Sequence, residues 1–343
     1  MNTLTMKRFS IGVSFAFILI GLTGCGEKAS APPAGAAPLL TKITVQTNWY
    51  AQPEHGGFYQ ALVKGYYREV GLDVTINQGG PNAIPRQKVA TGAVEFGVGR
   101  TDELLVAAGQ GVPLVALGAL MQRDPQAILF HKESGIRNFK DLDGRGLMAE
   151  PGAVWLKILE KKMGLKMSTL PLDYGLSRFL ADKKFVQQCF ITNEPFYVRQ
   201  QGADAGTLLL SDAGIRPYRI WYTSRSFLTK NPAAARAFTA ASIRGWRDYI
   251  EGDRKEADAL IGSLNPKMVP EFIAYSVGVM REFKLVEGDP SKGERIGQID
   301  PVRFANEITE LTAIGVLGRP VKLADVLDET FLPEDVRAAA ARK

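Results

Sequence analysis

Strand-like and helix-like segments alternate from residue 42 to residue 222, and this alternation constrains the fold of the chain more than any other feature. Residues 43–47 alternate polar and apolar side chains, as a half-buried strand does. Residues 57–70 then carry apolar side chains at helical spacing, and residues 72–76 form the next strand-like run. Further strand-like runs follow at 94–99, 113–120 and 127–130, with a helical pattern at 102–108. Such alternation is typical of a parallel sheet covered by helices.

A second series of the same kind begins near residue 139. After residues 219–222 the pattern becomes helical nearly to the end of the chain. Asn231 and Pro232 suit the N-cap and the first position of a long amphipathic helix over residues 233–250. The strand and helix patterns of the second series lie at 146–149, 155–163, 185–192 and 207–210.

The two series predict an α/β protein built from two doubly wound lobes. We expect lobe 1 to contain residues 41–131 and 223–343, and lobe 2 to contain residues 132–222. The strands near 127–132 and 219–224 would then be the two hinges. Ligands of open α/β sheets bind beyond the carboxyl ends of the strands, so binding residues are expected directly after predicted strands.

The N-terminal residues have the composition of a bacterial lipoprotein signal. Lys7 and Arg8 precede an apolar run over residues 11–22, which is too short for a stable membrane span, and small residues lead to Cys25. We therefore expect a signal peptide over residues 1–24, cleavage before Cys25 and acylation of that cysteine. An ordinary signal peptide or a short membrane anchor is the alternative.

Residues 25–40 are rich in Ala and Pro and cannot bury enough apolar surface to fold, so we expect the acylated cysteine to be followed by a flexible tether. The expected location is the cell envelope, with the protein held to a membrane by its N-terminal lipid and facing the periplasm or the cell exterior.

Composition argues against several classes of function. Hydrophobic residues make up 45% of the chain and charged residues 23%, which are globular values. The net charge of +6, or +4 without Lys7 and Arg8, is spread without a basic run, so no nucleic-acid partner is expected. With only His55 and His131 and no spaced ligand cluster, neither a metal site nor a cofactor is expected. Cys189 lies in a strand-like run and is expected to be a buried, unreactive thiol.

Several segments together resemble a known family. Residues 48–59 (NWYAQPEHGGFY) place a Trp, a Pro-containing turn, a His, small residues and an aromatic before a helix, and residues 64–74 read KGYYREVGLDV. The likeness continues through 92–98, 139–144 and 228–232 and covers most of the chain after the tether. In this order and spacing the segments resemble substrate-binding proteins of ABC importers, of the sulfonate and thiamine-pyrimidine-precursor class.

The resemblance implies a type II periplasmic-binding-protein fold and a protein that is not an enzyme. It implies a solute-binding lipoprotein that closes two lobes around a small molecule and delivers it to the permease and ATPase subunits of an ABC importer. We expect a monomer. The favoured ligand is a thiamine-pyrimidine precursor or a similar heterocycle. Sulfonate, nitrate, riboflavin and aromatic carboxylates stay open, since Ala51 and Gln52 replace the Pro-Asn of the pyrimidine binders.

Two other functions match parts of the sequence. A eukaryotic relative of the family makes the thiamine pyrimidine, sacrificing an active-site His and holding iron near a cysteine-rich loop. Here Glu103 stands in place of that His, and no cysteine cluster occurs near residues 220–225, so a synthase is not expected. A ligand-sensing lipoprotein that presents its ligand to another membrane protein is the third alternative.

Trp49, His55 and Tyr59 follow the first predicted strand and are candidate ligand residues. Trp49 and Tyr59 could stack on a planar ligand while His55 forms a hydrogen bond with its edge. Alternatively, both aromatic residues belong to the core and His55 is a satisfied residue at a helix start.

Arg100, Thr101 and Asp102 follow the strand at 94–99. Arg100 could bind a carboxylate, sulfonate or phosphate through two hydrogen bonds, and Thr101 or Asp102 could cap the next helix with free amides facing a ligand. The alternatives are a solvated arginine and a purely capping role.

In the second series, Glu150 lies between a strand and a helix, where backbone N–H groups face a ligand. Asn193 and Glu194 follow another strand, at a place where the resemblance implies an acidic or amide residue pointing at the ligand. A carboxylate at Glu194 would accept two N–H groups from an aminopyrimidine or amidine-like edge. The alternatives are an N-cap for Asn193 and a salt bridge for Glu194.

Overall fold

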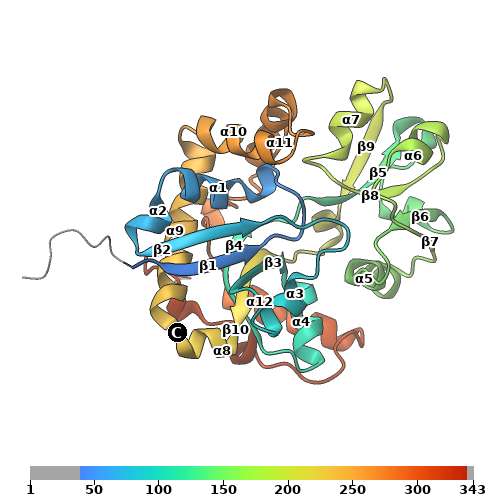
Figure 1. Ribbon diagram of the computed structural model, residues 1–343. Helices are drawn as coiled ribbons and strands as arrows, with labels where there is room; N and C mark the ends of the chain where they lie inside the picture. The colour runs from blue at the N-terminus through green and yellow to red at the C-terminus, as the bar shows by residue number, and fades with distance from the viewer. Residues whose placement is uncertain (1–38, 338–343) are drawn as a thin grey trace, which may run out of the picture. The chain divides into compact units, whose positions relative to one another are not determined.

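Two five-stranded sheets form the framework of the computed structural model, which describes residues 39–337 (Figure 1). We call them sheet A, formed by β1–β4 and β10, and sheet B, formed by β5–β9. Both sheets mix parallel and antiparallel pairs and are flanked by helices. The prediction of an α/β fold with two sheets is confirmed.

Sheet A has the strand order β2-β1-β3-β10-β4. Strands β1, β2 and β3 run parallel, and β10 runs antiparallel between β3 and β4. The strands are β1 (Thr41–Gln46), β2 (Leu72–Asn77), β3 (Phe96–Arg100), β4 (Leu114–Met121) and β10 (Arg219–Ser224). The helical segments among β1 to β4 are η1 (Pro53–His55), α1 (Gly56–Val63), α2 (Tyr66–Glu69), α3 (Pro85–Ala90) and α4 (Thr101–Gly109).

Sheet B has the strand order β7-β6-β8-β5-β9. Here β6, β7 and β8 run parallel, and β5 runs antiparallel between β8 and β9. The strands are β5 (Gln126–His131), β6 (Gly146–Ala149), β7 (Ser168–Pro171), β8 (Gln187–Phe190) and β9 (Ala205–Leu209). The helical segments are η2 (Lys132–Ser134), η3 (Phe139–Leu142), α5 (Val154–Met163), α6 (Ser177–Ala181), α7 (Glu194–Gln200) and η4 (Leu210–Ala213).

The two sheets share one connectivity. In each sheet the first parallel strand lies between the second and the third, and an antiparallel strand lies between the third and the fourth. That antiparallel strand is β10 in sheet A and β5 in sheet B. The chain passes from sheet A to sheet B through residues 122–125, which lead into β5, and returns to sheet A through residues 210–218, which lead into β10. We call these two segments the first and the second crossing. The carboxyl ends of β1, β3, β6 and β8 therefore lie at the sheet edges that adjoin these crossings.

Strand pairing differs from the expected lobe borders at two strands. Strand β5, expected at the end of lobe 1, pairs with β8 and β9 in sheet B. Strand β10, expected largely in lobe 2, pairs with β3 and β4 in sheet A. Apolar periodicity identifies a strand but does not tell which sheet it joins. We keep the division into two lobes as a proposal, with residues 122–125 and 210–218 as its borders.

Arg303 forms hydrogen bonds with both crossings. Its guanidinium donates to the backbone oxygens of Gln122 and Arg216, each at 2.8 Å. The same group lies 3.7 Å from the ring centroid of Tyr218. Gln122 belongs to the first crossing, and Arg216 and Tyr218 belong to the second. One side chain of α12 (Pro301–Ala313) thus holds both crossings side by side.

The chain after β10 is helical, as predicted. The helix expected over residues 233–250 is α9 (Pro232–Glu251), which Pro232 opens. Asn231 precedes it, although its side chain forms no capping hydrogen bond with the described residues. The other helical segments of this part are α8 (Arg225–Lys230), α10 (Lys255–Leu264), α11 (Pro270–Glu282), η5 (Pro290–Lys292), α13 (Leu323–Val326) and η6 (Glu329–Phe331).

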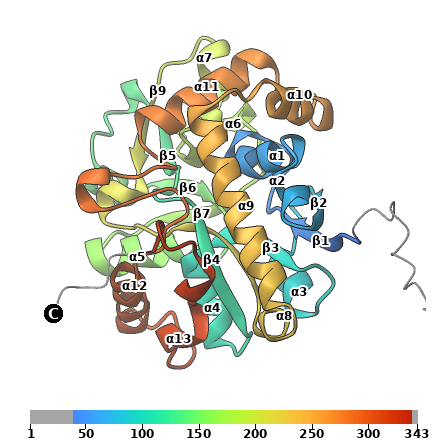
Figure 2. The same ribbon diagram turned by 90° about the vertical axis from the view of Figure 1, so that its left-hand side faces the viewer.

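Helices α1 and α9 approach each other closely through glycines, and Figure 2 shows α9 running beside α1 and α2. A Cβ atom added at Gly57 would lie 2.2 Å from the indole ring of Trp246, and one added at Gly245 would lie 2.2 Å from the backbone oxygen of Gly57. Phe58 packs edge-on against Trp221 and Trp246 in the core beneath. This contact fixes the start of α1, and hence the segment that follows β1.

No helix within residues 39–337 is long and apolar enough to cross a bilayer. The expected signal peptide, Cys25 and most of the expected tether lie outside the described residues.

Replacing Gly57 by Ala should lower the free energy of unfolding by about 1–3 kcal/mol, because the new methyl group overlaps Trp246 in a filled core. Urea unfolding followed by circular dichroism measures the change. Gly278→Ala in α11 is the matched control, because a Cβ atom there meets no described atom within 4 Å. It should leave stability unchanged or raise it by up to about 1 kcal/mol. Equal stability of the two variants would contradict the close packing.

Candidate ligand-binding site

The residues expected to bind a ligand follow four strands at the edges that adjoin the crossings. Strand β1 lies between β2 and β3, and β6 lies between β7 and β8, so the strand order reverses at the same point of each sheet. Open α/β sheets bind ligands at such points. Trp49, His55 and Tyr59 follow β1; Arg100, Thr101 and Asp102 stand at the end of β3; Glu150 follows β6; and Asn193 and Glu194 follow β8.

An aromatic contact joins the two sheets at Trp49. The indole ring of this half-buried residue lies 4.8 Å from the ring of Tyr174, with 39° between the planes. Tyr174 belongs to the segment between β7 and α6, and its φ of 60° lies in the left-handed region that non-glycine residues rarely adopt. Backbone strain of this kind clusters at functional sites. The contact brings a residue that follows β1 of sheet A against a residue that follows β7 of sheet B.

Glu54, His55 and Tyr59 are buried but incompletely hydrogen-bonded. Oε1 of Glu54 accepts a hydrogen bond from the Thr192 hydroxyl at 2.5 Å, which links η1 to the end of β8. Nε2 of His55 lies 3.1 Å from Oδ1 of Asn48 and donates to it, because an amide oxygen only accepts. Oε2 of Glu54, Nδ1 of His55 and the Tyr59 hydroxyl have no hydrogen-bond partner among residues 39–337. Three polar side chains within residues 54–59 thus have hydrogen-bonding atoms without a partner among the described residues.

Burial determines the charge of this segment. Burial, reinforced by the nearby charge of Arg219 and partly opposed by the backbone of Tyr50, lowers the pKa of His55 to about 3. The imidazole is therefore neutral at pH 7, with Nδ1 as an acceptor. Burial raises the pKa of Glu54, while the hydrogen bond from Thr192 opposes that rise.

The charged residues at the end of β3 pair with one another. The Arg100 guanidinium donates to both carboxylate oxygens of Asp102 and to the side-chain oxygen of Gln126, and its Nε lies 3.6 Å from Oδ2 of Asp124. Asp102 also accepts the backbone N–H of Glu103 at 2.8 Å. The Arg100 guanidinium therefore binds other protein groups. We call the network of Arg100, Asp102, Asp124 and Gln126 the framework of the candidate site.

Thr101 adjoins the same framework. Its hydroxyl donates to Glu307 of α12 at 2.7 Å and accepts the backbone N–H of Tyr218 at 3.0 Å. Thr101 thereby ties the start of α4 to the second crossing.

Arg219 is a second buried guanidinium at this edge, which the sequence analysis did not single out. It pairs in register with Arg100, because β10 runs antiparallel to β3. Its Nε lies 3.6 Å from Oδ2 of Asp124 and forms no hydrogen bond with the described residues. The guanidinium lies over the Phe190 ring at 4.5 Å. Arg219 begins its strand, so a search limited to the carboxyl ends of strands misses it.

Sheet B contributes Glu194, which opens α7. Its Oε2 accepts the backbone N–H of Phe190 at 2.8 Å. Burial raises the pKa of Glu194 to about 7, partly opposed by the hydrogen bond from Phe190 and reinforced by the charge of Glu54. Glu54 and Glu194 thus influence each other across the junction of the sheets.

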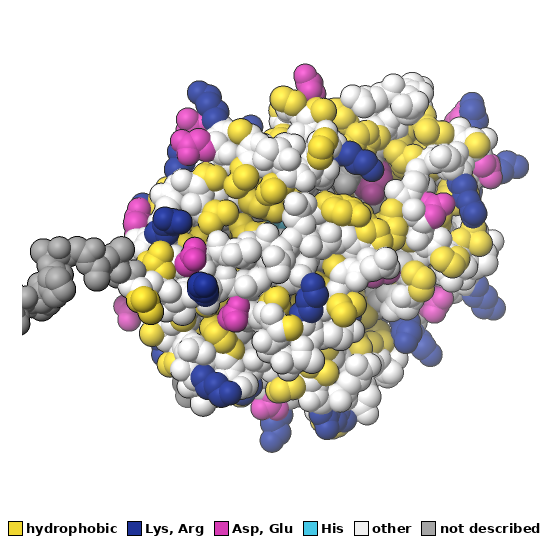
Figure 3. Space-filling model, in the orientation of Figure 1, with side chains coloured by type: hydrophobic (Ala, Val, Ile, Leu, Met, Phe, Trp, Pro, Cys, Tyr) yellow, Lys and Arg dark blue, Asp and Glu magenta, His cyan; other side chains and the backbone are white. Residues whose placement is uncertain are grey.

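Asn193 and Glu150 lie at the same edge of sheet B without a distinctive contact. Asn193 precedes α7, and its side chain caps no N–H group in the described part of the chain. Glu150 is exposed, and its backbone N–H donates to the side-chain oxygen of Gln188 at 3.0 Å. Figure 3 shows this face of the molecule, where an acidic side chain lies recessed in a hollow between the part that carries α11 and the part that carries sheet B.

The junction also contains residues that the sequence analysis missed. Thr192 and Glu54 lie beside predicted residues, and only their contact with each other distinguishes them. Tyr174 follows β7, a short exposed strand whose sequence shows no strand pattern. Arg219 stands at the start of a strand, as described above. Thr192 and Glu54 could have been found from the sequence because they adjoin predicted ligand residues. No feature of the sequence indicates Tyr174.

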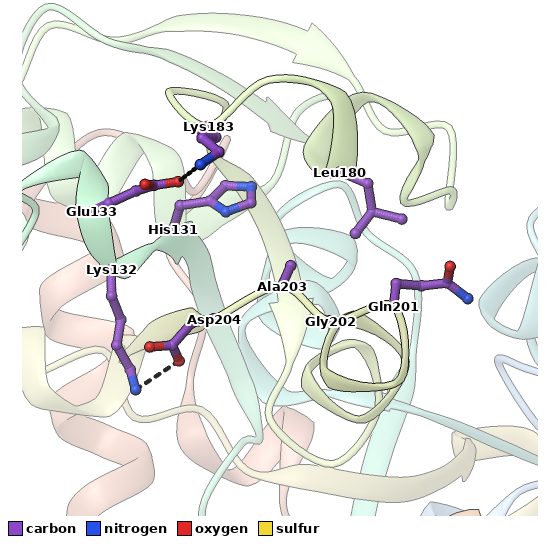
Figure 4. Close-up of a pocket in the computed structure, with 9 residues that line it drawn as sticks. All are labelled: His131, Lys132, Glu133, Leu180, Lys183, Gln201, Gly202, Ala203 and Asp204. Carbon is purple, nitrogen blue, oxygen red and sulfur yellow. Dashed lines mark ion pairs between the residues drawn. The ribbon is translucent and has the colours of Figure 1, made fainter.

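A different hollow, of about 580 Å³, lies away from the junction beside β5 and β9 (Figure 4). Lys132 pairs with Asp204 and Lys183 pairs with Glu133, each at 2.7 Å. His131, also in its wall, donates from Nε2 to the backbone oxygen of Phe179 at 2.7 Å and stacks on the Phe179 ring. These charged groups satisfy one another, so we locate the candidate site at the junction of the sheets. The residues that line the hollow are His131, Lys132, Glu133, Leu180, Lys183, Gln201, Gly202, Ala203 and Asp204.

Comparison with protein families and curated proteins gives the relatives of this sequence. The family model described as NMT1/THI5 like matches residues 52–255. The chain is 23% identical over 326 residues to the riboflavin-binding protein RibY of Chloroflexus aurantiacus, covering 91% of this chain and 92% of that protein. It is 24% identical over 306 residues to the 4-amino-5-hydroxymethyl-2-methylpyrimidine phosphate synthase THI11 of Saccharomyces cerevisiae, covering 78% of this chain and 87% of that protein.

Solved structures with the same fold include two binding proteins. The periplasmic aliphatic sulphonate binding protein SsuA of Escherichia coli matches with a TM-score of 0.60 at 14% identity, covering 84% of this chain and 92% of SsuA. The periplasmic nitrate-binding protein NrtA of Synechocystis matches with a TM-score of 0.61 at 15% identity, covering 88% of this chain and 89% of NrtA. At these identities the likeness shows the fold alone, and the predicted periplasmic-binding-protein fold is confirmed.

The expectation that the protein is not an enzyme is contradicted by its sequence relatives. The Saccharomyces cerevisiae protein and a Candida albicans relative, 25% identical over 253 residues, are both named as pyrimidine phosphate synthases. The expectation rested on Glu103 and on the lack of a cysteine cluster near residues 220–225, and such single positions do not define the activity of a whole family.

Replacing Arg100 by Met should lower the free energy of unfolding by about 3–5 kcal/mol, because Asp102 would stay buried without its counter-charge and Asp124 would keep only Arg219. Chemical denaturation at pH 7 measures the loss. The control is Arg247→Met, which breaks an exposed pair with Asp335 and should cost less than about 1 kcal/mol. If R100M unfolds like the parent protein and loses ligand affinity instead, Arg100 contacts the ligand and is not part of the framework.

Proposed function

This chain belongs to the NMT1/THI5-like family, and we propose that it captures a small heterocyclic molecule at the junction of its two sheets. The observation that carries the proposal is that Oε2 of Glu54, Nδ1 of His55 and the Tyr59 hydroxyl, on η1 and α1, have no hydrogen-bond partner among the described residues. Oε1 of Gln60 on α1 also has none, but the amide nitrogen of that residue donates to Asp248 and Asp253. A buried polar group without a partner costs about 1–3 kcal/mol, so folded proteins keep few of them. Three such groups lie in one short segment, close to the contacts that Trp49 and Glu54 make with residues of sheet B. This arrangement supports a role in ligand binding.

The chemistry around these atoms favours a flat ring that bears hydrogen-bonding groups. Trp49 and Tyr174 offer aromatic faces from the two sheets, and stacking on such faces suits a planar heterocycle. Neutral His55 offers an acceptor, and Glu194 with Glu54 offers carboxyl groups. A thiamine-pyrimidine precursor is therefore the proposed ligand, with riboflavin as the nearest alternative because RibY is named for it. Sulfonate, nitrate and aromatic carboxylates are the remaining alternatives.

We propose that capture works by closure of the two sheets around the ligand. Side chains meet across the junction: Thr192 donates to Glu54 at 2.5 Å, and the Tyr275 hydroxyl of α11 donates to the backbone oxygen of Ile191 at 2.7 Å. A ligand that touches both sheets would favour this closed arrangement over an open one. The short crossings held by Arg303 are the segments about which such a motion would turn.

The wider role we propose is delivery of the ligand to an ABC importer. The fold is shared with a ligand-binding component of an ABC-type import system and with periplasmic binding proteins, which supports a place outside the cytoplasm. In this proposal Cys25 carries the lipid, the protein acts as a monomer, and a permease and its ATPase are its partners. Presentation of the ligand to a sensor is the alternative.

Substituting Trp49 by Ala should weaken binding of the heterocyclic ligand by about 1–3 kcal/mol, or roughly 5- to 150-fold in Kd, because a stacking face is lost. Isothermal titration with 4-amino-5-hydroxymethyl-2-methylpyrimidine, riboflavin, an alkanesulfonate and nitrate identifies the ligand and measures the change. Phe283→Ala, which removes an exposed aromatic residue at the end of α11, is the matched control and should bind like the parent protein. Unchanged affinity of W49A, or no heat with either heterocycle, would refute the proposal.

A further inference from the structure

Glu54 presents its two carboxyl oxygens to different surroundings. Oε1 accepts the Thr192 hydroxyl at 2.5 Å, whereas Oε2 has no hydrogen-bond partner in the described part of the chain. The side chain is 3% exposed, so ordinary solvent contact does not satisfy that oxygen. Glu54 lies on η1, which follows β1 of sheet A, and Thr192 follows β8 of sheet B. One carboxyl group therefore spans the junction and keeps a free acceptor.

Thr192 cannot serve both oxygens. A hydroxyl donates a single proton, and that proton is directed at Oε1. His55, the next residue, donates from Nε2 to Asn48 and offers only an acceptor at Nδ1. Nε of Arg219, whose charge acts on Glu54, is a buried donor that also lacks a hydrogen-bond partner among residues 39–337, but it forms no hydrogen bond with Oε2. Water or a ligand N–H group would supply the missing donor.

The charges around Glu54 decide which ligands fit. Arg100 and Arg219 are the buried cations of the junction, and each lies 3.6 Å from Asp124. Carboxyl groups are more numerous than these cations, so the junction offers a ligand more hydrogen-bond acceptors than positive charges, which favours an N–H donor or a cation over an anion. The carboxyl groups are those of Glu54, Asp102, Asp124 and Glu194.

We propose that Glu54 is the specificity-determining residue of the site, with Oε1 holding Thr192 and Oε2 accepting an N–H group from the ligand. This inference rests on the proposed function and narrows its ligand to rings that bear an amino or ring N–H group. Recognition and closure then use the same carboxyl group, because a ligand N–H that orients Glu54 also presents Oε1 to Thr192. Sulfonate and nitrate, the ligands for which two structural neighbours are named, do not meet this requirement.

The test compares ligands that differ in one N–H group. The first pair is 4-amino-5-hydroxymethyl-2-methylpyrimidine and the same compound without its amino group. The second pair is riboflavin and riboflavin methylated at its ring N–H. The parent protein should bind the N–H member of the pair that it recognises at least about tenfold more tightly, since a hydrogen bond to a charged group contributes that much. Titration calorimetry supplies the four dissociation constants.

Two variants separate recognition from closure. Glu54→Gln keeps the size of the side chain and an acceptor for Thr192, and turns a donor toward the ligand. It should reduce the preference for the N–H compound to less than about threefold. Thr192→Val removes the contact between the sheets and leaves Oε2 unchanged, so it should weaken both members of a pair by a similar factor and keep the preference. Thermal unfolding checks each variant, and Glu54→Asp replaces E54Q if the latter does not fold.

Each outcome bears on one of the two proposals. Equal binding of both members by the parent protein, or an undiminished preference in E54Q, would overturn the role of Glu54. Equal binding of both members would leave heterocycle capture intact. Binding of neither pair would refute the proposed function, and the role of Glu54 with it.

Discussion

The structure depends on a buried carboxylate between two guanidinium groups. Asp124 lies in the first crossing of the chain, 3.6 Å from Arg100 at the end of β3 and 3.6 Å from Arg219 at the start of β10. Its other oxygen accepts the backbone N–H of Gln126, with which β5 begins. Buried ion pairs contribute little net stability, but removing one partner is costly, so such groups hold a geometry in place. Here they hold the point where the chain passes from one sheet to the other.

The position of the candidate site follows from that geometry. The crossings adjoin the carboxyl ends of β1, β3, β6 and β8, so the loops after these strands come together. The contacts between Trp49 and Tyr174 and between Glu54 and Thr192 occur in this region. Segments more than a hundred residues apart in the sequence thereby meet at the candidate site, to which both sheets contribute residues.

Much of the fold could be predicted from the sequence because its signals are local. The long helix α9 was predicted from its periodicity and from Pro232, and most strands from runs of apolar residues. Strand β7 was missed because all four of its residues are exposed and lack an apolar pattern. The sheets joined by β5 and β10 could not be predicted, since pairing partners are set by the packing of the whole chain.

The candidate site was predictable in location and less so in its members. Placing ligand residues after strands identified the segments that carry Trp49, His55 and Glu194. The same rule made Arg100 a candidate ligand residue. In the structure the Arg100 guanidinium donates to the carboxylate of Asp102, and such a pairing depends on side-chain conformations that the sequence does not reveal. Glu54 was missed because its hydrogen bond with Thr192, 138 positions away, cannot be read from the sequence. Arg219 was missed because only the antiparallel pairing of β10 with β3 brings it beside Arg100.

The most direct measurement is a crystal structure of the protein with the heterocycle that binds most tightly. The account predicts electron density for the ring between the two sheets, in contact with Trp49 or Tyr174 and within hydrogen-bond distance of Glu54 or His55. A ligand bound instead in the hollow beside His131, or on one sheet with no contact to the other, would contradict it.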